Sequence, residues 1–160
     1  MNRSSLALLL ILFVGLFYGC HFSHTQEKEH FFSGSVWNRF VPFEDTLKIE
    51  HPDLVYDLNI QLSVWNTFEH SLIPLQVIIT YPNGQESVFI KHLSIKDLDG
   101  NFLGSAKGDI WTTNIDVFSE REFPEKGNYI INIQNLTQYY DLPKVSAISF
   151  TLNGQKPKKN

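Results

Sequence analysis

The stretch YDLNIQLSVW, residues 56–65, decides the fold class, because apolar and polar residues alternate along it. Successive side chains of a β-strand point to opposite faces, so a period of two predicts a strand with one buried face. The other face is polar apart from Trp65, which indicates a half-buried strand. The face predicted to lie on a core carries Tyr56, Leu58, Ile60, Leu62 and Val64.

Further strand-like runs follow this segment, separated by turn sequences. In LQVIITYPNGQESVFIKHLSI, residues 75–95, two apolar runs flank Asn83-Gly84, a pair that favours a tight hairpin turn. The segment 92–106, HLSIKDLDGNFLGSA, repeats the pattern around Asp99-Gly100, and GNYIINIQNL and KVSAISFTL complete the set. Short strands at this spacing predict an all-β protein, an antiparallel β-sandwich of the immunoglobulin or jelly-roll type.

The N-terminus is predicted to be an export signal. Residues 6–19 are all apolar or Gly and follow Arg3. As a helix this run reaches roughly 21 Å, short of the ~30 Å hydrocarbon core, and so it is typical of a signal peptide. Gly19 before Cys20 resembles the lipobox of bacterial lipoproteins, in which the cysteine is acylated and becomes the first residue. A plain signal peptide, or an anchor with an incidental thiol, is the alternative.

These features divide the chain into four parts. Residues 1–19 are predicted to form the lipoprotein signal peptide, with Cys20 as the lipidation site that attaches the protein to a membrane. Residues 20–30 are polar and lack periodicity, which predicts a flexible tether. The sandwich domain is expected over 31–153, and the polar residues 154–160 form a tail.

Charge and cysteine content exclude some classes of protein. Without residues 1–19 the chain loses one basic residue and carries a net charge near −5, against −4 for the whole sequence. This balance offers no basic stripe for a phosphate backbone, so nucleic acid is not expected as a partner. Cys20 is the only cysteine, so the domain can form no internal disulfide.

No catalytic or metal motif stands out, and the protein is expected to be neither an enzyme nor dependent on a cofactor. DLDGN, residues 97–101, resembles part of a calcium loop, but it lacks the later ligands and is explained by a hairpin turn. The six histidines are scattered, so no metal site is predicted. A hydrolase would need carboxylates, or a Ser and a His, to converge in one cleft.

The three tryptophans leave a second function open. Trp37, Trp65 and Trp111 could stack on sugars in a carbohydrate-binding β-sandwich lipoprotein, although core or rim positions are the commoner use of tryptophan in a sandwich. An exposed aromatic platform would favour the carbohydrate-binding alternative.

One short motif suggests a modification. Asp45-Thr46-Leu47 resembles the acceptor sequence for O-glycosylation of exported Bacteroidetes proteins, which would place a glycan on Thr46. A Thr opening a strand is the simpler interpretation.

Several motifs together resemble the GldH family, the gliding-motility-associated lipoproteins of Bacteroidetes. They are DLDGNFLGSAKGDIW, with its D-x-D-G-x-x-L-G core, and FPEKGNYIINIQNL, with Phe-Pro, Gly-x-Tyr and Gln134. YDLNIQLSVWNT, Asp141-Leu142 and the closing VSAISFTL extend the similarity over about residues 31–152.

The resemblance implies a β-sandwich lipoprotein without known catalysis. It implies a place among envelope lipoproteins needed for gliding and for the associated secretion system, with such lipoproteins or secretion and motility proteins as partners. HFSHTQEKEH after the lipid site is only a loose match to the acidic export signals of surface lipoproteins, so the periplasmic side of the envelope is expected.

Overall fold

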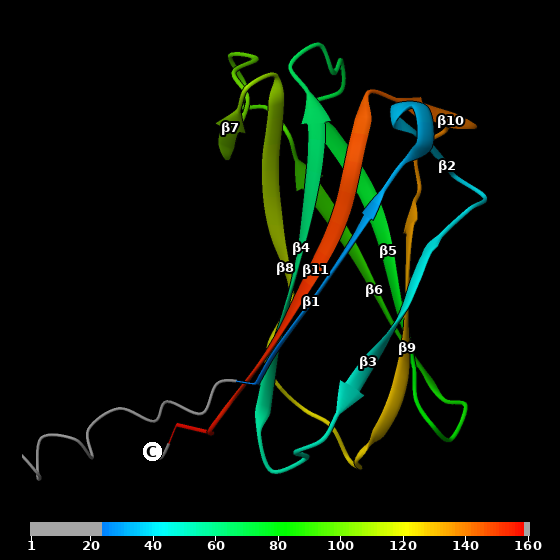
Figure 1. The fold of residues 1–160 in the computed structure, drawn as a ribbon, viewed down its shortest axis with the longest axis vertical. Coiled ribbons are helices and arrows are strands. Elements are labelled where there is room, and N and C mark those ends of the chain that lie inside the picture. The colour runs from blue at the N-terminus through cyan, green and yellow to red at the C-terminus, as the bar shows by residue number, and fades with distance from the viewer. Residues whose placement is uncertain (1–23, 159–160) are drawn as a thin grey trace, which may run out of the picture.

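The computed structural model describes residues 24–158, and this part of the chain is built from β-strands and one short 3-10 turn (Figure 1). The fold is all-β and antiparallel, as the sequence predicts. In chain order the elements are β1 (His24–Phe31), η1 (Ser33–Ser35), β2 (Val36–Asn38), β3 (Phe43–Ile49), β4 (Val55–Trp65), β5 (Leu72–Thr80), β6 (Glu86–Ser94), β7 (Ser105–Lys107), β8 (Ile110–Glu122), β9 (Gly127–Asn135), β10 (Asp141–Pro143) and β11 (Val145–Gln155).

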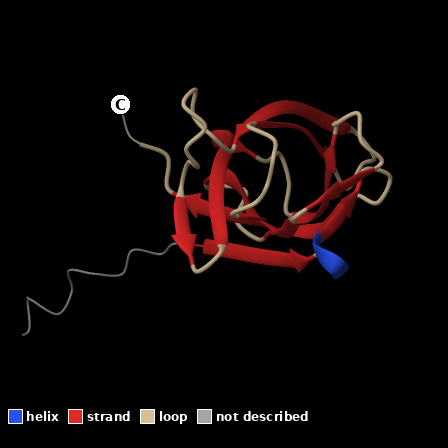
Figure 2. Ribbon diagram, turned by 90° about the horizontal axis from the view of Figure 1, so that it is seen from above, coloured by secondary structure: helices blue, strands red, loops and turns tan. Residues whose placement is uncertain are grey.

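Two sheets form the sandwich. One has the strand order β1-β11-β4-β8-β7, and the other has the order β3-β9-β5-β6. A small separate pair, β10 with β2, lies at one end of the molecule (Figure 1). Seen from above, the strands curve around a common interior (Figure 2). Two facing sheets of this kind confirm the predicted β-sandwich.

The central strand β4 behaves as its sequence predicts. Tyr56, Leu58, Ile60, Leu62 and Val64 are all fully buried, whereas the residues between them are partly exposed. β4 lies between β11 and β8, so its backbone groups have hydrogen-bonding partners on both sides. Its inward face meets apolar side chains of β5, β9 and β11 in one continuous core. Removal of this apolar surface from water is the main stabilising contribution to the sandwich.

The hairpin predicted at Asn83-Gly84 joins β5 to β6. Gly84 has φ +82°, a conformation that glycine adopts without steric cost, and the turn closes with a Tyr81 N–H to Gln85 O hydrogen bond of 2.8 Å. The turn at Asp99-Gly100 is also present, between β6 and β7, with Gly100 at φ +85°. Both local turn predictions are confirmed.

The predicted tether at residues 20–30 is wrong for residues 24–30. His24–Phe31 form β1, an edge strand that pairs with β11 from His24↔Gly154 to Phe31↔Ala147. Most of its side chains are exposed, so the strand carries no hydrophobic pattern and backbone hydrogen bonding holds it. Because β11 pairs with β1 as far as Gly154, it extends to Gln155, two residues into the predicted tail.

β8 is the longest strand among the described residues, and it was not predicted from the sequence. Its pairing with β4 shifts register on both sides of Leu58, and Glu120 has φ +52°. Near these irregularities the consecutive residues Val117 and Phe118 are both partly or fully buried. Two inward-facing residues in a row break the period of two. A bulged strand therefore escapes a search for alternation.

Candidate functional site

The predicted lipid site, Cys20, lies outside the described residues, and so does the predicted signal peptide. Among residues 24–158, no helix has the length and apolar character that crossing a membrane requires.

Thr46 lies within β3, not at the start of a strand, and its side chain is exposed. It lies opposite Ile130 of β9, on the outer face of the four-stranded sheet. This position leaves the hydroxyl accessible, and glycosylation of Thr46 stays a prediction.

The three tryptophans do not form one exposed platform. Trp37 is fully buried and stacks on Phe32 at 5.2 Å between ring centroids. Trp111 packs against the core and stacks on Phe102 at 5.3 Å. Trp65 is 39% exposed. The exposed aromatic platform that would favour carbohydrate binding is therefore not formed by these three tryptophans.

The DLDGN segment is held by its own side chains. Asp97 accepts hydrogen bonds from the backbone N–H of Asp99 (3.0 Å) and Asn101 (2.8 Å), and from the Asn101 side-chain amide (3.1 Å). The Asn101 hydrogen bonds lower the pKa of the Asp97 carboxyl, because they stabilise the charged form. The turn interpretation of this motif accounts for these contacts.

A polar cluster closes the sandwich between β6 and β8. The Arg121 guanidinium donates to the hydroxyls of Tyr81 and Ser87, and lies 5.1 Å from the Phe89 ring centroid and 5.5 Å from that of Phe118. Burial raises the pKa of Tyr81, but its hydrogen bonds with Ser87 and Arg121 outweigh burial and lower the pKa overall. These contacts join the edges of the two sheets and indicate a structural role.

An aromatic surface lies at the end of the sandwich that carries β2 and β10, far from the start of β1 (Figure 1). We call Phe40, Val41, Tyr139 and Tyr140 the distal aromatic surface. Phe40 is 65%, Val41 62% and Tyr140 71% exposed. The Phe40 and Tyr140 rings are 5.4 Å apart, and the Arg39 N–H donates to Tyr140 O at 2.9 Å, which fixes the two loops against each other.

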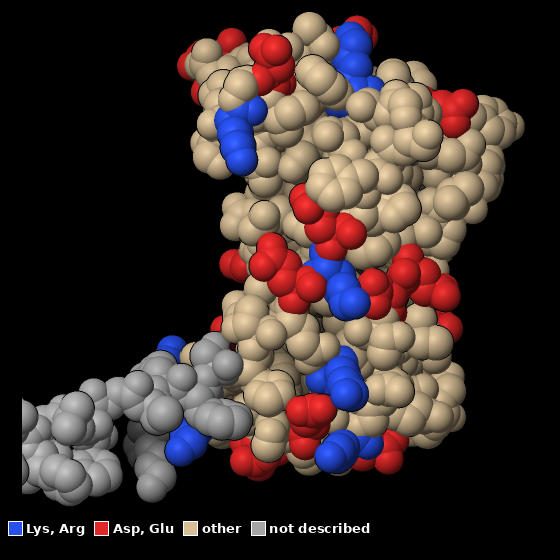
Figure 3. Space-filling view, viewed as in Figure 1, with Lys and Arg blue, Asp and Glu red and all other residues tan. Residues whose placement is uncertain are grey.

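The charged side chains, in contrast to the distal aromatic surface, do not gather in one place on the face that Figure 3 shows. On the face of the described chain in Figure 3, basic and acidic side chains are intermixed, so this face carries no basic stripe.

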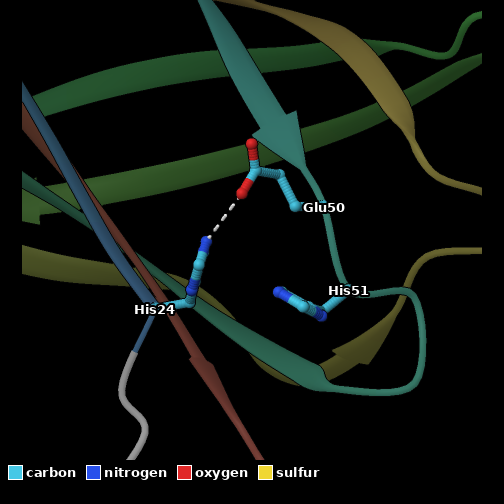
Figure 4. A group of neighbouring side chains, drawn as sticks. All are labelled: His24, Glu50 and His51. Carbon is cyan, nitrogen blue, oxygen red and sulfur yellow. Dashed lines mark hydrogen bonds and ion pairs between the residues drawn. The ribbon is translucent and has the colours of Figure 1, made fainter.

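A second cluster gathers at the opposite end, where β1 begins (Figure 4). His24 opens β1, while Glu50 and His51 directly follow β3. The His24 Nε2 and Glu50 Oε2 atoms are 3.1 Å apart, and the two imidazole rings meet edge to face at 4.9 Å. One possible ligand atom from each residue lies within 4.8 Å of the others. These three side chains could hold a metal ion.

The carboxylate of this cluster is held in its charged form. The hydrogen bond from His24 and then that from Lys48, whose Nζ is 3.3 Å from Glu50 Oε1, keep the pKa of Glu50 below its ordinary value of 4.5. Beside it, His51 Nδ1 lies 4.0 Å from Asp53 Oδ1. At neutral pH the cluster therefore presents an ionised carboxylate beside the imidazoles of His24 and His51.

This cluster was not predicted from the sequence, because the histidines are scattered along the chain and His24 falls in the predicted tether. The adjacent pair Glu50-His51 was the only local signal. The pairing of β1 with β11 brings His24 to the pair from a position 26 residues earlier in the chain.

Together these features define the chain as a small antiparallel β-sandwich domain with an exposed aromatic cluster at one end. The family model described as GldH lipoprotein matches residues 24–152. The chain therefore belongs to the GldH lipoprotein family, which confirms the resemblance found in the sequence. Membership of a lipoprotein family implies a lipid anchor to a membrane.

The other comparisons add little. No curated protein matches the chain. Among solved structures, the crystal structure of the infectious bursal disease virus VP2 subviral particle is similar over 84% of this chain, at 12% sequence identity and a TM-score of 0.35. The match spans 32% of the viral chain.

Proposed function

We propose that this protein is a non-catalytic component of an envelope assembly linked to gliding motility and its associated secretion system. A lipid on Cys20 holds it to the membrane on the periplasmic side, and it acts by contact with other envelope proteins. Membership of the GldH lipoprotein family supports the anchor and the type of protein.

The observation that carries the contact function is the distal aromatic surface. Large exposed apolar side chains in one cluster are unfavourable in water and commonly mark an interaction site. Tyrosine and phenylalanine supply much of the binding energy at the centres of protein interfaces. The Phe40 and Tyr140 rings are already in contact, so a partner would meet a surface that is largely formed.

The short link to the lipid supports an oriented domain. β1 begins at His24, four residues after Cys20, and four residues span at most about 14 Å. The end with His24 would therefore stay close to the membrane, and the distal aromatic surface would point away from it. This link is shorter than the tether predicted from the sequence, and it restricts how far the domain can reorient.

The anchor is tested with Cys20→Ser in the native organism. We expect the serine variant to leave the membrane fraction and to rescue a deletion strain poorly in motility and secretion assays. A serine variant that sediments with membranes as firmly as the wild type would overturn the anchor. Full rescue by an untethered periplasmic form would overturn the need for it.

The contact function is tested with Phe40→Ser/Tyr140→Ser at normal anchoring. We expect this double variant to be exported and folded but to rescue the deletion poorly. Leu98→Ser is the matched control, because Leu98 is a fully exposed apolar residue in a different loop. Equal rescue by both variants would contradict the proposed role of the distal aromatic surface, and labelling of the domain on intact cells would contradict the periplasmic placement.

A further inference from the structure

We propose that His24, Glu50 and His51 form a binding site for a divalent transition-metal ion, with Zn²⁺ as the best fit. Two imidazoles and one carboxylate are a ligand set that zinc accepts in proteins, with water in the fourth position. All three side chains are partly exposed, so an ion and its water can reach them from solvent. This inference rests on the geometry of the cluster and not on the proposed function.

The distances suit a tetrahedral ion after a small adjustment. Ligand atoms about 2.0–2.2 Å from zinc lie roughly 3.3–3.6 Å from one another in a tetrahedron. The His24 and Glu50 ligand atoms are already 3.1 Å apart, and the whole set lies within 4.8 Å. The His51 ring points toward the other two side chains in Figure 4, and rotation of this partly exposed ring would close the remaining gap.

The surroundings provide the second set of contacts that metal ligands need. A metal-bound imidazole usually directs its other nitrogen to a carboxylate, which fixes the tautomer and the ring orientation. His51 Nδ1 is 4.0 Å from Asp53 Oδ1, so a carboxylate of this kind lies beside the His51 ring. The Tyr56 hydroxyl donates to the backbone oxygen of His51 at 3.0 Å and so holds the loop in place.

The two oxygens of the Glu50 carboxylate face different partners. Lys48 Nζ lies 3.3 Å from Glu50 Oε1, whereas Oε2 faces His24. A metal ion would replace the hydrogen bond between His24 and Oε2 and leave the lysine contact intact. Occupation would cross-link the start of β1 to the loop that follows β3, and so would fasten the first strand to the opposite sheet.

The experiment measures Zn²⁺ binding to the full-length lipidated protein, purified in detergent without a histidine tag. Isothermal titration at pH 7.5 gives the stoichiometry and Kd, and thermal unfolding with and without Zn²⁺ gives the effect on stability. We expect one tightly bound Zn²⁺ per chain and a higher Tm in its presence, because a metal that binds the folded state stabilises it. Binding should weaken toward pH 5.5, since protons compete for the imidazoles.

Three variants remove one ligand each: His24→Gln, Glu50→Gln and His51→Gln. Each should weaken Zn²⁺ binding at least about tenfold, since even loss of an outer partner costs that much. His92→Gln is the matched control, because His92 is an exposed histidine of β6 at a different place in the fold. His51→Cys retains a zinc ligand and should keep the tight binding, which separates loss of a ligand from loss of the fold.

The outcomes decide the proposal. Tight binding that depends on the three residues and survives in His51→Cys and His92→Gln would support it. Absence of Zn²⁺ binding, or binding that none of the three substitutions weakens, would overturn it. Binding that is lost in His21→Gln but kept in the three variants would also overturn it, because the ion would then be held by the N-terminal segment.

Discussion

Truncation of Ile60 to alanine tests the central strand most directly. Ile60 is fully buried in β4, between Phe150 of β11 and Ile115 of β8 in the sheet. Phe150 is fully buried as well, so the neighbours of Ile60 have little freedom to fill the space that the substitution leaves. We expect Ile60→Ala to fold but to be markedly less stable.

The magnitude follows from the groups removed. Ile→Ala deletes three carbon groups, and about 0.8 kcal/mol for each gives about 2.4 kcal/mol of lost hydrophobic transfer. The cavity that remains adds a further cost, and measured substitutions of this type span about 2–5 kcal/mol. For a tightly packed central strand we expect about 3–4 kcal/mol, and the same range for Leu62→Ala, since Leu62 is also fully buried.

Equilibrium urea unfolding of the purified protein, followed by tryptophan fluorescence, measures the change. Gln61→Ala is the matched control, because Gln61 lies between the two core residues on the opposite, partly exposed face. Its cost should stay under about 0.5 kcal/mol. Equal destabilisation by Ile60→Ala, Leu62→Ala and Gln61→Ala would refute the assignment of one buried face.

Three further predictions concern other parts of the domain. Gly104→Ala should cost more than about 2 kcal/mol in urea unfolding, because Gly104 has φ +89° and a Cβ there would lie 2.1 Å from a backbone oxygen of β8. Gly108→Ala, with open space around it at φ +61°, should cost about 1–2 kcal/mol. Equal costs for the two variants would contradict the steric argument. The pKa of Glu50 is lowered by the hydrogen bond from His24 and by a neighbouring lysine, so its contribution to stability is present above the ordinary glutamate value of 4.5 and is lost as the pH falls through the folded-state pKa. The stability difference between wild type and Glu50→Gln should therefore shrink between pH 6 and pH 3, and a constant difference would refute the linkage. Peptide mass mapping of the native protein should find a glycan on Thr46, and a wholly unmodified Thr46 peptide would rule this out.

The sequence by itself determined the features that depend on neighbouring residues. The alternation in residues 56–65 specifies which face of β4 is buried, because a one-residue shift would turn every apolar side chain outward. Asn83-Gly84 and Asp99-Gly100 specify turns, because glycine adopts the positive φ found there without steric cost. The turn and strand motifs were also sufficient to indicate the GldH lipoprotein family.

Only the tertiary structure decided the features that depend on distant partners. β1 has few buried side chains and exists because β11 supplies its backbone hydrogen bonds, so its own residues give no hydrophobic signal. Trp37 is buried and Trp65 is partly exposed, although both are tryptophans in or beside strands, since burial depends on what the opposite sheet places against each ring. The approach of His24 to Glu50 and His51 likewise results from strand pairing across more than twenty residues, a contact that no local spacing in the sequence encodes.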